Sequence, residues 1–246
     1  MASQTGTTVY RLKLTERSIA ASQTLALKFE KPASFTFRPG QYLTLTLPDP
    51  LDANAPGESR TLSIASAPHE NFLMVATRLR NTVFKQRLSQ LELNSEVRID
   101  GPGGSFAMDI GTAQTAVFVV GGIGITPVRS ILVSAAWKEL PLRTVLFYSN
   151  HKPEDALFLD ELTDLQSVNP HYQLVASMTR LKESRQEWTG CTEHLSWELF
   201  AKHVADAISP VYYVVGPPRF VDSMRALLAE RGVNPGNVRA EDFSGY

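Results

Sequence analysis

Two short segments have the residue types that bind phosphate, and they are built differently. The first is Arg60-Thr61-Leu62-Ser63, at the edge of a β-rich region. The second runs from Gly121 to Pro127, with the sequence Gly-Gly-Ile-Gly-Ile-Thr-Pro. An arginine gives a phosphate two charge-assisted hydrogen bonds, whereas a helix N-terminus offers backbone N–H groups and a partial positive charge. Two such segments in one chain predict two nucleotide-like ligands held side by side.

The glycine-rich segment predicts a sharp turn from a buried strand into a helix. Residues 116–120 are Ala-Val-Phe-Val-Val, an apolar run that is typical of a strand covered on both faces. Gly121, Gly122 and Gly124 allow a ligand to approach the backbone closely and permit positive φ angles. Pro127 suits the first helical turn, which it is expected to open, because its missing N–H leaves no hydrogen bond unmade there. A tight turn that binds nothing remains the alternative for this segment taken alone.

Arg60 needs support from other groups to hold a ligand. In an extended strand, Arg60, Leu62 and Ile64 share one face, and Thr61 and Ser63 share the other. Each charge-assisted hydrogen bond contributes about 1.5–3 kcal/mol, whereas nanomolar binding requires about 12 kcal/mol. We therefore expect a helix N-terminus, backbone donors and ring stacking to complete this site.

The first 110 residues predict a small antiparallel β-barrel. Apolar and polar side chains alternate in short stretches that are separated by Pro, Gly and Asn. The expected strands are residues 9–15, 23–29, 41–47, 60–65, 72–78 and 96–99. One helix is expected from residue 82 to residue 91, with Thr82 as its N-cap and Phe84, Leu88 and Leu91 at helical spacing.

The remainder of the chain predicts a parallel, doubly wound α/β nucleotide-binding domain. Apolar strands alternate with helices beyond residues 109–114, which is the signature of such a sheet. The expected strands are residues 115–120, 144–148, 173–177 and 211–215, and the expected helices are residues 127–137, 156–165 and 220–231. The sequence thus predicts two domains, residues 1–110 and residues 111–246.

Composition narrows the class of protein. The 246 residues are 43% hydrophobic and 20% charged with a net charge of −1, which is typical of a globular protein and not of one that binds nucleic acid or a membrane surface. Cys191 is the only cysteine, so the chain cannot bind an iron–sulfur cluster or form an internal disulfide. Because no signal peptide or apolar span of about 18 residues occurs, we expect a cytoplasmic protein. The five histidines are scattered, and no metal site is expected.

The two phosphate-binding segments occur together with two further motifs. These are Val215-Gly216-Pro217-Pro218 and the ending Glu241-Asp242-Phe243-Ser244-Gly245-Tyr246. In this order and spacing, along nearly the whole chain, the motifs resemble those of the ferredoxin–NADP⁺ reductase superfamily. The resemblance implies a flavin bound by the barrel and a nicotinamide dinucleotide bound by the α/β domain.

The resemblance also implies roles for individual residues. On the flavin side, the motif residues are Arg60 at the flavin phosphate, Thr61, Leu62, Ser63 near flavin N5, and Thr82 as a donor to the flavin pyrophosphate. On the nicotinamide side, they are Gly121, Gly122, Gly124, Thr126 and Pro127 around the pyrophosphate, Ser149 and Asn150 after the second strand, and Gly216 and Pro217 beside the nicotinamide. Glu241 and Phe243 match a catalytic Glu-x-aromatic pattern, in which the aromatic ring covers the flavin; Tyr246 is the competing candidate for that ring.

Three positions depart from the family pattern. Leu62 stands where an aromatic residue usually stacks on the flavin, and Val215 stands where many relatives have cysteine. Residues 149–152 contain neither the arginine that often binds a 2′-phosphate nor an acidic residue for a ribose 2′-hydroxyl, although Arg180 and Arg185 follow. The absence of an acidic residue and the presence of Arg180 and Arg185 favour NADPH, and NADH remains the alternative.

We therefore expect a flavin-dependent oxidoreductase that passes hydride from NAD(P)H to FAD and then electrons to an acceptor. FMN is the alternative flavin. The acceptor is open: ferredoxin, flavodoxin, a haem protein, an oxygenase component or free flavin would each suit. Two alternatives to a free-standing reductase remain. One is a reductase subunit of a multicomponent oxygenase or other electron-transfer complex, and the other is a regulatory module that kept the fold.

Overall fold

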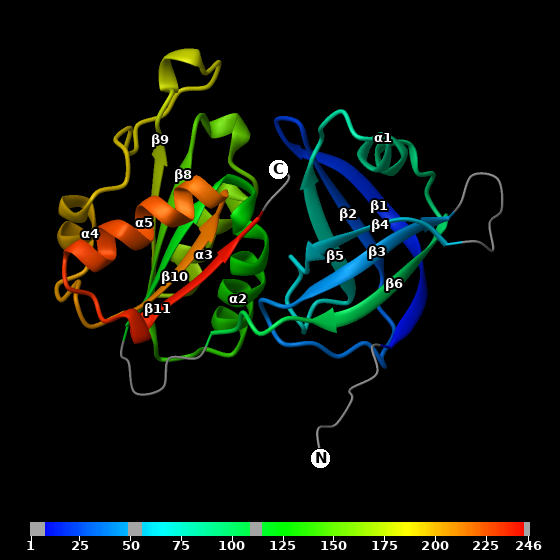
Figure 1. The fold of residues 1–246 in the computed structure, drawn as a ribbon, viewed down its shortest axis with the longest axis horizontal. Coiled ribbons are helices and arrows are strands. Elements are labelled where there is room, and N and C mark those ends of the chain that lie inside the picture. Colours follow the sequence, from blue (N-terminus) through cyan, green and yellow to red (C-terminus); the bar gives the residue numbers. More distant parts are fainter. Residues whose placement is uncertain (1–7, 49–55, 109–114, 244–246) are drawn as a thin grey trace.

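The computed structural model describes residues 8–48, 56–108 and 115–243, which form two lobes (Figure 1). The first lobe is an antiparallel sheet with the strand order β4-β3-β6-β1-β2-β5. Its elements are β1 (Val9–Ala21), β2 (Thr24–Glu30), β3 (Tyr42–Pro48), β4 (Pro56–Ser63), β5 (Phe72–Arg78), α1 (Val83–Gln90) and β6 (Glu96–Gly103). The N–H of Ala65 donates to the carbonyl of Met74, 2.7 Å away, so the segment after β4 meets β5 and closes the sheet.

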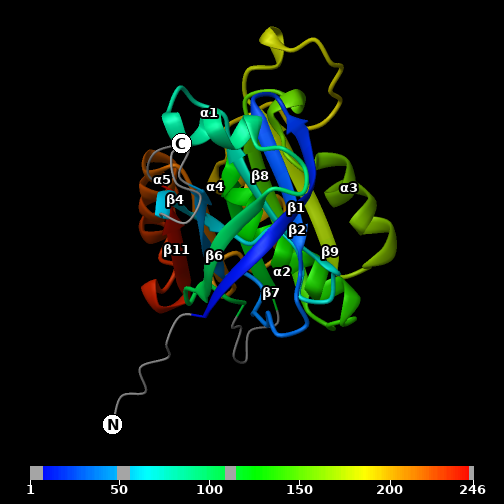
Figure 2. The ribbon, with the colours of Figure 1, turned by 90° about the vertical axis from the view of Figure 1, so that its right-hand side faces the viewer.

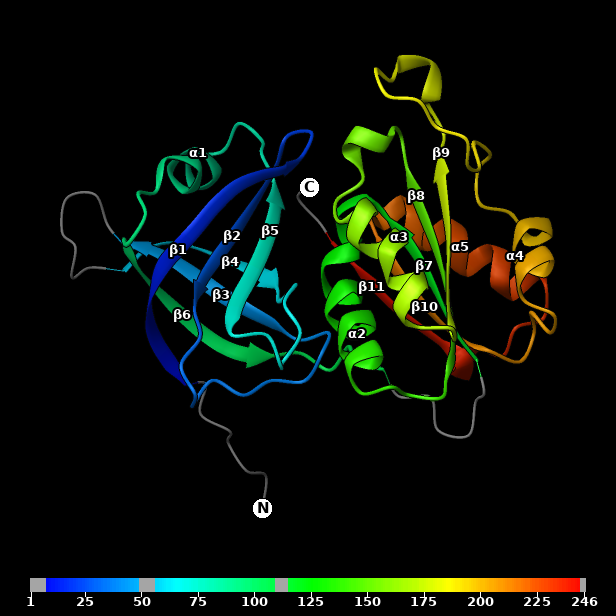
Figure 3. The ribbon, with the colours of Figure 1, turned by 180° about the vertical axis from the view of Figure 1, so that it is seen from behind.

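The barrel core follows from alternation along the strands. Leu43, Leu45 and Leu47 of β3 are all buried, as are Leu62 near the end of β4 and Ile64 directly after it. Helix α1 covers one end of the barrel in all three views (Figures 1, 2 and 3), where its buried residues Phe84 and Leu88 join the same hydrophobic cluster. The predicted barrel and its capping helix are confirmed.

The second lobe is a parallel five-stranded sheet with the order β11-β10-β7-β8-β9. Its strands are β7 (Thr115–Gly121), β8 (Arg143–Asn150), β9 (Tyr172–Met178), β10 (Val211–Gly216) and β11 (Val238–Asp242). Its helices are α2 (Ile125–Trp137), α3 (Leu159–Val168), α4 (Trp197–His203) and α5 (Pro218–Glu230). Phe118 and Val120 of β7 pack with α2 and α3, while Val117 and Val119 pack with α4 and α5. Helices therefore cover both faces, which confirms the doubly wound fold.

Several element boundaries differ from the predicted ones. Helix α2 begins at Ile125 and not at Pro127, because the glycine turn is already wound as a 3₁₀ turn over Gly122–Gly124. The helix predicted over residues 156–165 is α3, which begins at Leu159 and ends at Val168, and a 3₁₀ turn over Pro153–Asp155 precedes it. Strand β11 and helix α4 were not predicted. The predicted domain boundary near residue 110 falls outside the described residues.

The two lobes contact each other on the side of the parallel sheet that α2 and α3 cover. Helix α2 is the element of the second lobe nearest the barrel (Figures 1 and 3), and Ala26 and Ala76 of the barrel belong to the same hydrophobic cluster as α2. Two hydrogen bonds to the 3₁₀ turn at Pro153–Asp155 add to this contact, from the Ser22 N–H to the Glu154 carbonyl and from Arg78 to the Asp155 carbonyl. No helix among the described residues is long and apolar enough to span a membrane.

Candidate active site

The first phosphate-binding segment lies at the end of β4, where the predicted alternation is observed. Leu62 is buried in the barrel core with 3% of its surface exposed, while Thr61 on the opposite face bonds the hydroxyl of Thr44 at 3.2 Å. Ser63 lies directly opposite Tyr42 in the β3–β4 pair and is half-buried. Leu62 is therefore a core residue of the barrel. It does not provide the aromatic ring that the family pattern has at this position.

Arg60 extends from β4 toward the start of α1. Its guanidinium lies over the Phe84 ring, 5.3 Å from the centroid, and donates to the carbonyl of Ser59 at 2.7 Å. Thr82 is the N-cap of α1, as predicted, and its hydroxyl oxygen accepts from the N–H of Lys85 at 3.3 Å. Arg60 thus points its charge toward a helix N-terminus, where backbone N–H groups also favour an anion.

A cluster of basic side chains that sequence reasoning missed surrounds this helix N-terminus. Burial lowers the pKa of Lys85, and the positive charges of Arg80 and Arg60 lower it further. An anion placed among these side chains would relieve their mutual repulsion. A cavity of about 630 Å³ opens beside them, lined by Gln23, Arg78, Leu79, Arg80, Asn81, Lys85, Gln86 and Ser89. Three basic residues in one short stretch, 78–85, were the available signal.

The glycine turn joins β7 to α2 and packs tightly against the end of β10. Gly122 adopts a φ of +53°, which favours glycine. A Cβ on Gly124 would lie 2.7 Å from the carbonyl oxygen of Val215, and one on Gly121 would lie 3.0 Å from the Phe220 ring. These glycines therefore allow two backbone segments to approach each other at the carboxyl edge of the sheet, where ligands bind in this class of fold.

Two residues of the turn are less available to a ligand than the sequence predicts. Thr126 is buried, and its hydroxyl donates to the carbonyl of Ile123 at 3.1 Å. Pro127 is the third residue of α2, still within the first turn, where N–H groups have no partner inside the helix. The turn accordingly presents backbone from residues 121–124 more than it presents these two side chains.

Arg78 extends from the barrel lobe to the glycine turn. It ends β5, donates to the carbonyl of Asp155 at 3.2 Å, and places Nη2 only 3.5 Å from the position of a Cβ on Gly122. Ser149 pairs with Gly121 in the parallel sheet, and Asn150 is buried at the end of the same strand. A basic side chain and two strand ends thus converge on one turn.

The C-terminal residues reach the site through a strand. Within the β10–β11 pair, Glu241 lies opposite Val215 and Asp242 opposite Gly216. The N–H of Phe243 donates to the carbonyl of Gly216 at 3.0 Å, and its ring packs against the cluster that contains α2. Gly216, with Pro217 after it, therefore stands between the glycine turn and Phe243. Tyr246 lies outside the described residues.

Glu241 is an unusual carboxylate, because one of its oxygens, Oε2, is buried and has no hydrogen-bond partner within the described residues. Burial raises its pKa to about 7, and the charge of Asp242 acts in the same direction. A group of this kind holds or releases a proton near neutral pH.

We expect Glu241→Gln to stabilise the fold more at high pH than at low pH. The folded pKa of Glu241 lies above its ordinary value of 4.5, so ionisation disfavours the folded state progressively between these two values and fully above pH 7. The gain should reach about 1–2 kcal/mol at alkaline pH, after allowance for solvent near a half-buried group. Urea unfolding at acidic and alkaline pH measures it, with Glu230→Gln on the exposed face of α5 as control. An equal effect of Glu241→Gln at both pH values would contradict it.

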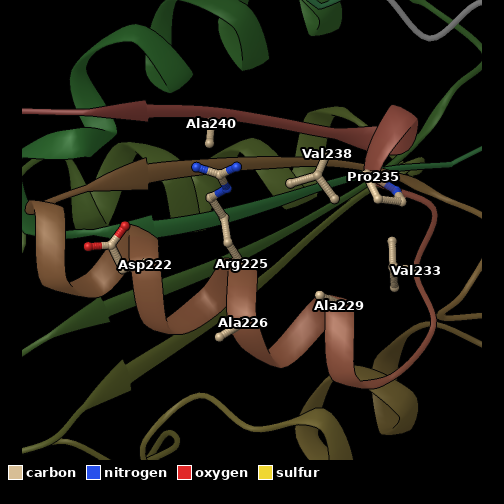
Figure 4. A pocket seen from close by; sticks show the side chains of 8 residues that line it. All are labelled: Asp222, Arg225, Ala226, Ala229, Val233, Pro235, Val238 and Ala240. Atoms are coloured by element: carbon tan, nitrogen blue, oxygen red, sulfur yellow. The ribbon is translucent and has the colours of Figure 1, made fainter.

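A second cavity lies apart from these residues. It measures about 550 Å³ and opens between α5 and the edge strand β11 (Figure 4). Its lining residues are Asp222, Arg225, Ala226, Ala229, Val233, Pro235, Val238 and Ala240. Among the described residues, this lining includes no side chain that the sequence predicts for the site. No group of three or more His, Cys, Asp or Glu in the described ranges could hold a metal ion.

Comparisons with known proteins show which families and folds the chain resembles. Residues 118–226 match the family model of the oxidoreductase NAD-binding domain. The chain is 25% identical over 222 residues to the glycine betaine monooxygenase reductase subunit of Chromohalobacter salexigens, covering 90% of this chain and 60% of the relative. It is 29% identical over 226 residues to ferredoxin–NADP reductase B of Sorangium cellulosum, covering 88% of this chain and 90% of that relative.

The solved structures show the same fold. A ferredoxin–NADP⁺ reductase from Neisseria gonorrhoeae with bound FAD and NADP superposes with a TM-score of 0.79 at 17% identity, covering 95% of this chain and 98% of that one. The chain spans 60% of the length of the glycine betaine monooxygenase reductase subunit and 63% of the length of the propane 2-monooxygenase reductase component of Mycolicibacterium goodii. Taken with the barrel and the doubly wound sheet, these likenesses show that the chain has the fold of the ferredoxin–NADP⁺ reductases and that its second lobe is similar to the oxidoreductase NAD-binding domain.

Proposed function

We propose that the chain is an NAD(P)H-dependent flavoprotein reductase that accepts hydride on FAD and passes electrons to an acceptor. The observation that carries the proposal is the position of two phosphate-type sites on contacting lobes. One comprises Arg60 and the N-terminus of α1, and the other is the glycine turn, which Arg78 reaches from the barrel. We further propose that the lobes correspond to domains 1–110 and 111–246, and that the protein is cytoplasmic, as its single cysteine suggests.

The residues around α1 fit the phosphates of a flavin. Arg60, Arg80 and Lys85 gather positive charge at the capped helix start, and the cavity beside them extends past Arg80 to Ser89. This extent suits the pyrophosphate and second nucleotide of FAD better than the single phosphate of FMN. When bound, the flavin supplies the redox chemistry, and the protein supplies orientation and exclusion of water.

The remaining site residues have proposed roles in positioning and proton balance. Ser63, half-buried at the end of β4, is proposed to contact the reacting edge of the flavin. Phe243, held to Gly216 by a backbone hydrogen bond, is proposed to cover the ring. Glu241 can hold a proton at its carboxyl group near neutral pH. Leu62 has no aromatic ring and is buried in the barrel core, so we assign it no stacking contact with the flavin.

We propose NADPH as the preferred reductant, with NADH as the alternative. The N–H of Arg180 donates to the carbonyl of His151 at 2.8 Å, which places the ends of β8 and β9 side by side. Burial lowers the pKa of His151, and the charge of Arg180 lowers it further. Arg180 thus brings to this edge a positive charge of the kind that binds a 2′-phosphate, while Lys152 is paired with Glu154 at 3.9 Å.

The acceptor is proposed to be a protein such as a ferredoxin, a flavodoxin or an oxygenase component. Support for the last comes from relatives named as monooxygenase and dioxygenase reductases. Support for a free-standing ferredoxin reductase comes from the relative in Sorangium cellulosum, of which the chain covers 90%. Co-purification of a partner from the native host separates the two.

Anaerobic stopped-flow spectroscopy tests the proposed function directly. Protein reconstituted with FAD is mixed separately with NADH and NADPH, and the visible flavin absorbance is followed. We expect rapid loss of the flavin absorbance. The limiting rate should be higher with NADPH than with NADH, and the concentration that gives half of that rate should be lower. Bound flavin that neither reductant bleaches would contradict the reductase, and failure to bind flavin would overturn the site at Arg60.

A further inference from the structure

Arg129 is a buried arginine in the middle of the contact between the two lobes. It lies on α2, and its side chain is only 6% exposed. Nη1 donates to the carbonyl of Ala65 at 2.8 Å and to Oε2 of Glu70 at 2.8 Å, while Nη2 donates to Oε1 of Glu70 at 3.0 Å. Nε and Nη2 donate to the two carboxylate oxygens of Glu161, at 2.8 and 2.5 Å. All five N–H groups of the guanidinium therefore have an acceptor.

The partners of Arg129 belong to different parts of the molecule. Ala65 and Glu70 lie in the barrel lobe, in the segment that begins directly after Ser63, whereas Glu161 lies on α3 of the second lobe. The neighbouring Ser130 hydroxyl donates to the carbonyl of Ser66 at 2.6 Å. Helix α2 itself begins at the glycine turn. One helix thus joins the barrel segment next to Ser63 to the turn proposed for the nicotinamide dinucleotide.

The energetics of this cluster favour a geometric role. Burial would raise the pKa of Glu70, but the hydrogen bonds from Arg129 and its charge, together with the N–H of Ala67, lower it, so this carboxylate is ionised and paired. A buried ion pair costs desolvation, and apolar side chains often stabilise a fold equally well. Two bidentate contacts on one planar guanidinium instead fix distances and angles, which a lysine or an apolar pair would not do.

We propose that Arg129 is a positioning residue for hydride transfer: its bonds to Glu70 and Ala65 set the barrel segment after Ser63 against the glycine turn. The inference rests on the proposed function, because it concerns the approach of nicotinamide to flavin. Reacting atoms must come within about 3–3.5 Å, and a displacement of about 1 Å can lower the rate about 100-fold. The effect is expected on the rate of the chemical step and not on the affinity of either ligand.

The chain offers a matched pair of variants. Glu70→Gln and Glu161→Gln each remove one carboxylate from the same guanidinium, but only Glu70 lies across the lobe boundary. We expect Glu70→Gln to lower the limiting rate of flavin reduction about 10-fold or more, with flavin and NADPH dissociation constants within about 2-fold of wild type. Glu161→Gln should leave the rate within about 2-fold. Arg129→Lys, which keeps the charge and loses the fork, should resemble Glu70→Gln.

A second measurement needs no flavin. Hydrogen–deuterium exchange of flavin-free protein should show faster exchange over residues 64–70 in Glu70→Gln than in Glu161→Gln, because the Ala67 N–H donates to the Glu70 carboxylate. Equal rate losses in the two glutamate variants, or a wild-type rate in Glu70→Gln, would overturn the inference. If wild-type protein binds flavin and is reduced by neither nucleotide, the proposed function fails and so does the positioning role. In that case, faster exchange confined to Glu70→Gln would show that Arg129 only links the two lobes structurally.

Discussion

Replacing Arg60 with alanine is expected to weaken flavin binding about 10- to 100-fold while the barrel stays folded. A guanidinium gives a phosphate charge-assisted hydrogen bonds worth about 1.5–3 kcal/mol each, and every 1.4 kcal/mol corresponds to about a tenfold change in affinity. Arg60 is exposed, and its ring contact with Phe84 contributes only about 0.5–1 kcal/mol to stability. The flavin dissociation constant, measured by quenching of flavin fluorescence, reports the loss.

The matched control for Arg60 is Arg98→Ala. Arg98 is an exposed arginine on β6 of the same lobe, and it is paired with Asp100 at 2.9 Å. Its loss removes equal charge from the barrel and should leave the flavin dissociation constant within about 2-fold. Arg60→Lys should fall between wild type and alanine, because it keeps a charge and loses bidentate geometry. Similar affinities for Arg60→Ala and Arg98→Ala would show that Arg60 does not bind the phosphate.

The features predicted from the sequence are those with a local signal. Alternation along β4 fixed which side chains enter the barrel core, and Leu62 is buried as that alternation requires. The N-cap at Thr82 and the strand–turn–helix around Gly122 also depend on neighbouring residues only. The error at the start of α2 has a local cause too, because the glycines of the predicted sharp turn wind into a 3₁₀ turn that leads into the helix two residues before Pro127.

The features that sequence reasoning missed depend on distant segments. Strand β11 carries exposed charges at Arg239 and Asp242, and only its pairing with β10 makes it a strand. The contact of Arg78 with the glycine turn joins residues 44 positions apart. Arg129 reads as a polar interruption of an apolar helix until the barrel segment containing Glu70 is packed against it. Such contacts follow from the packing of the lobes, which one sequence does not reveal.

Gly124→Ala is expected to lower nucleotide-dependent flavin reduction about 10-fold or more and to destabilise the fold by about 1–3 kcal/mol. The backbone of Gly124, with φ −56° and ψ −11°, suits any residue, so the effect is steric. The new Cβ would lie 2.7 Å from the oxygen and 2.9 Å from the carbon of the Val215 carbonyl. These backbone atoms cannot rotate away, so the end of β10 must move. Gly216 and the Phe243 bonded to it move with it.

Gly122→Ala separates this steric effect from the loss of backbone freedom. At Gly122 the φ of +53° disfavours alanine by about 1 kcal/mol, but the nearest atom to its Cβ would be Arg78 Nη2 at 3.5 Å, an ordinary contact. Both variants should therefore lose stability in urea unfolding, while only Gly124→Ala should displace β10. In stopped-flow reduction, Gly124→Ala should be slower than Gly122→Ala, with flavin affinity at Arg60 unchanged in each. Reduction of Gly124→Ala at the wild-type rate would mean that the close approach of the turn to Val215 is not what positions the nicotinamide.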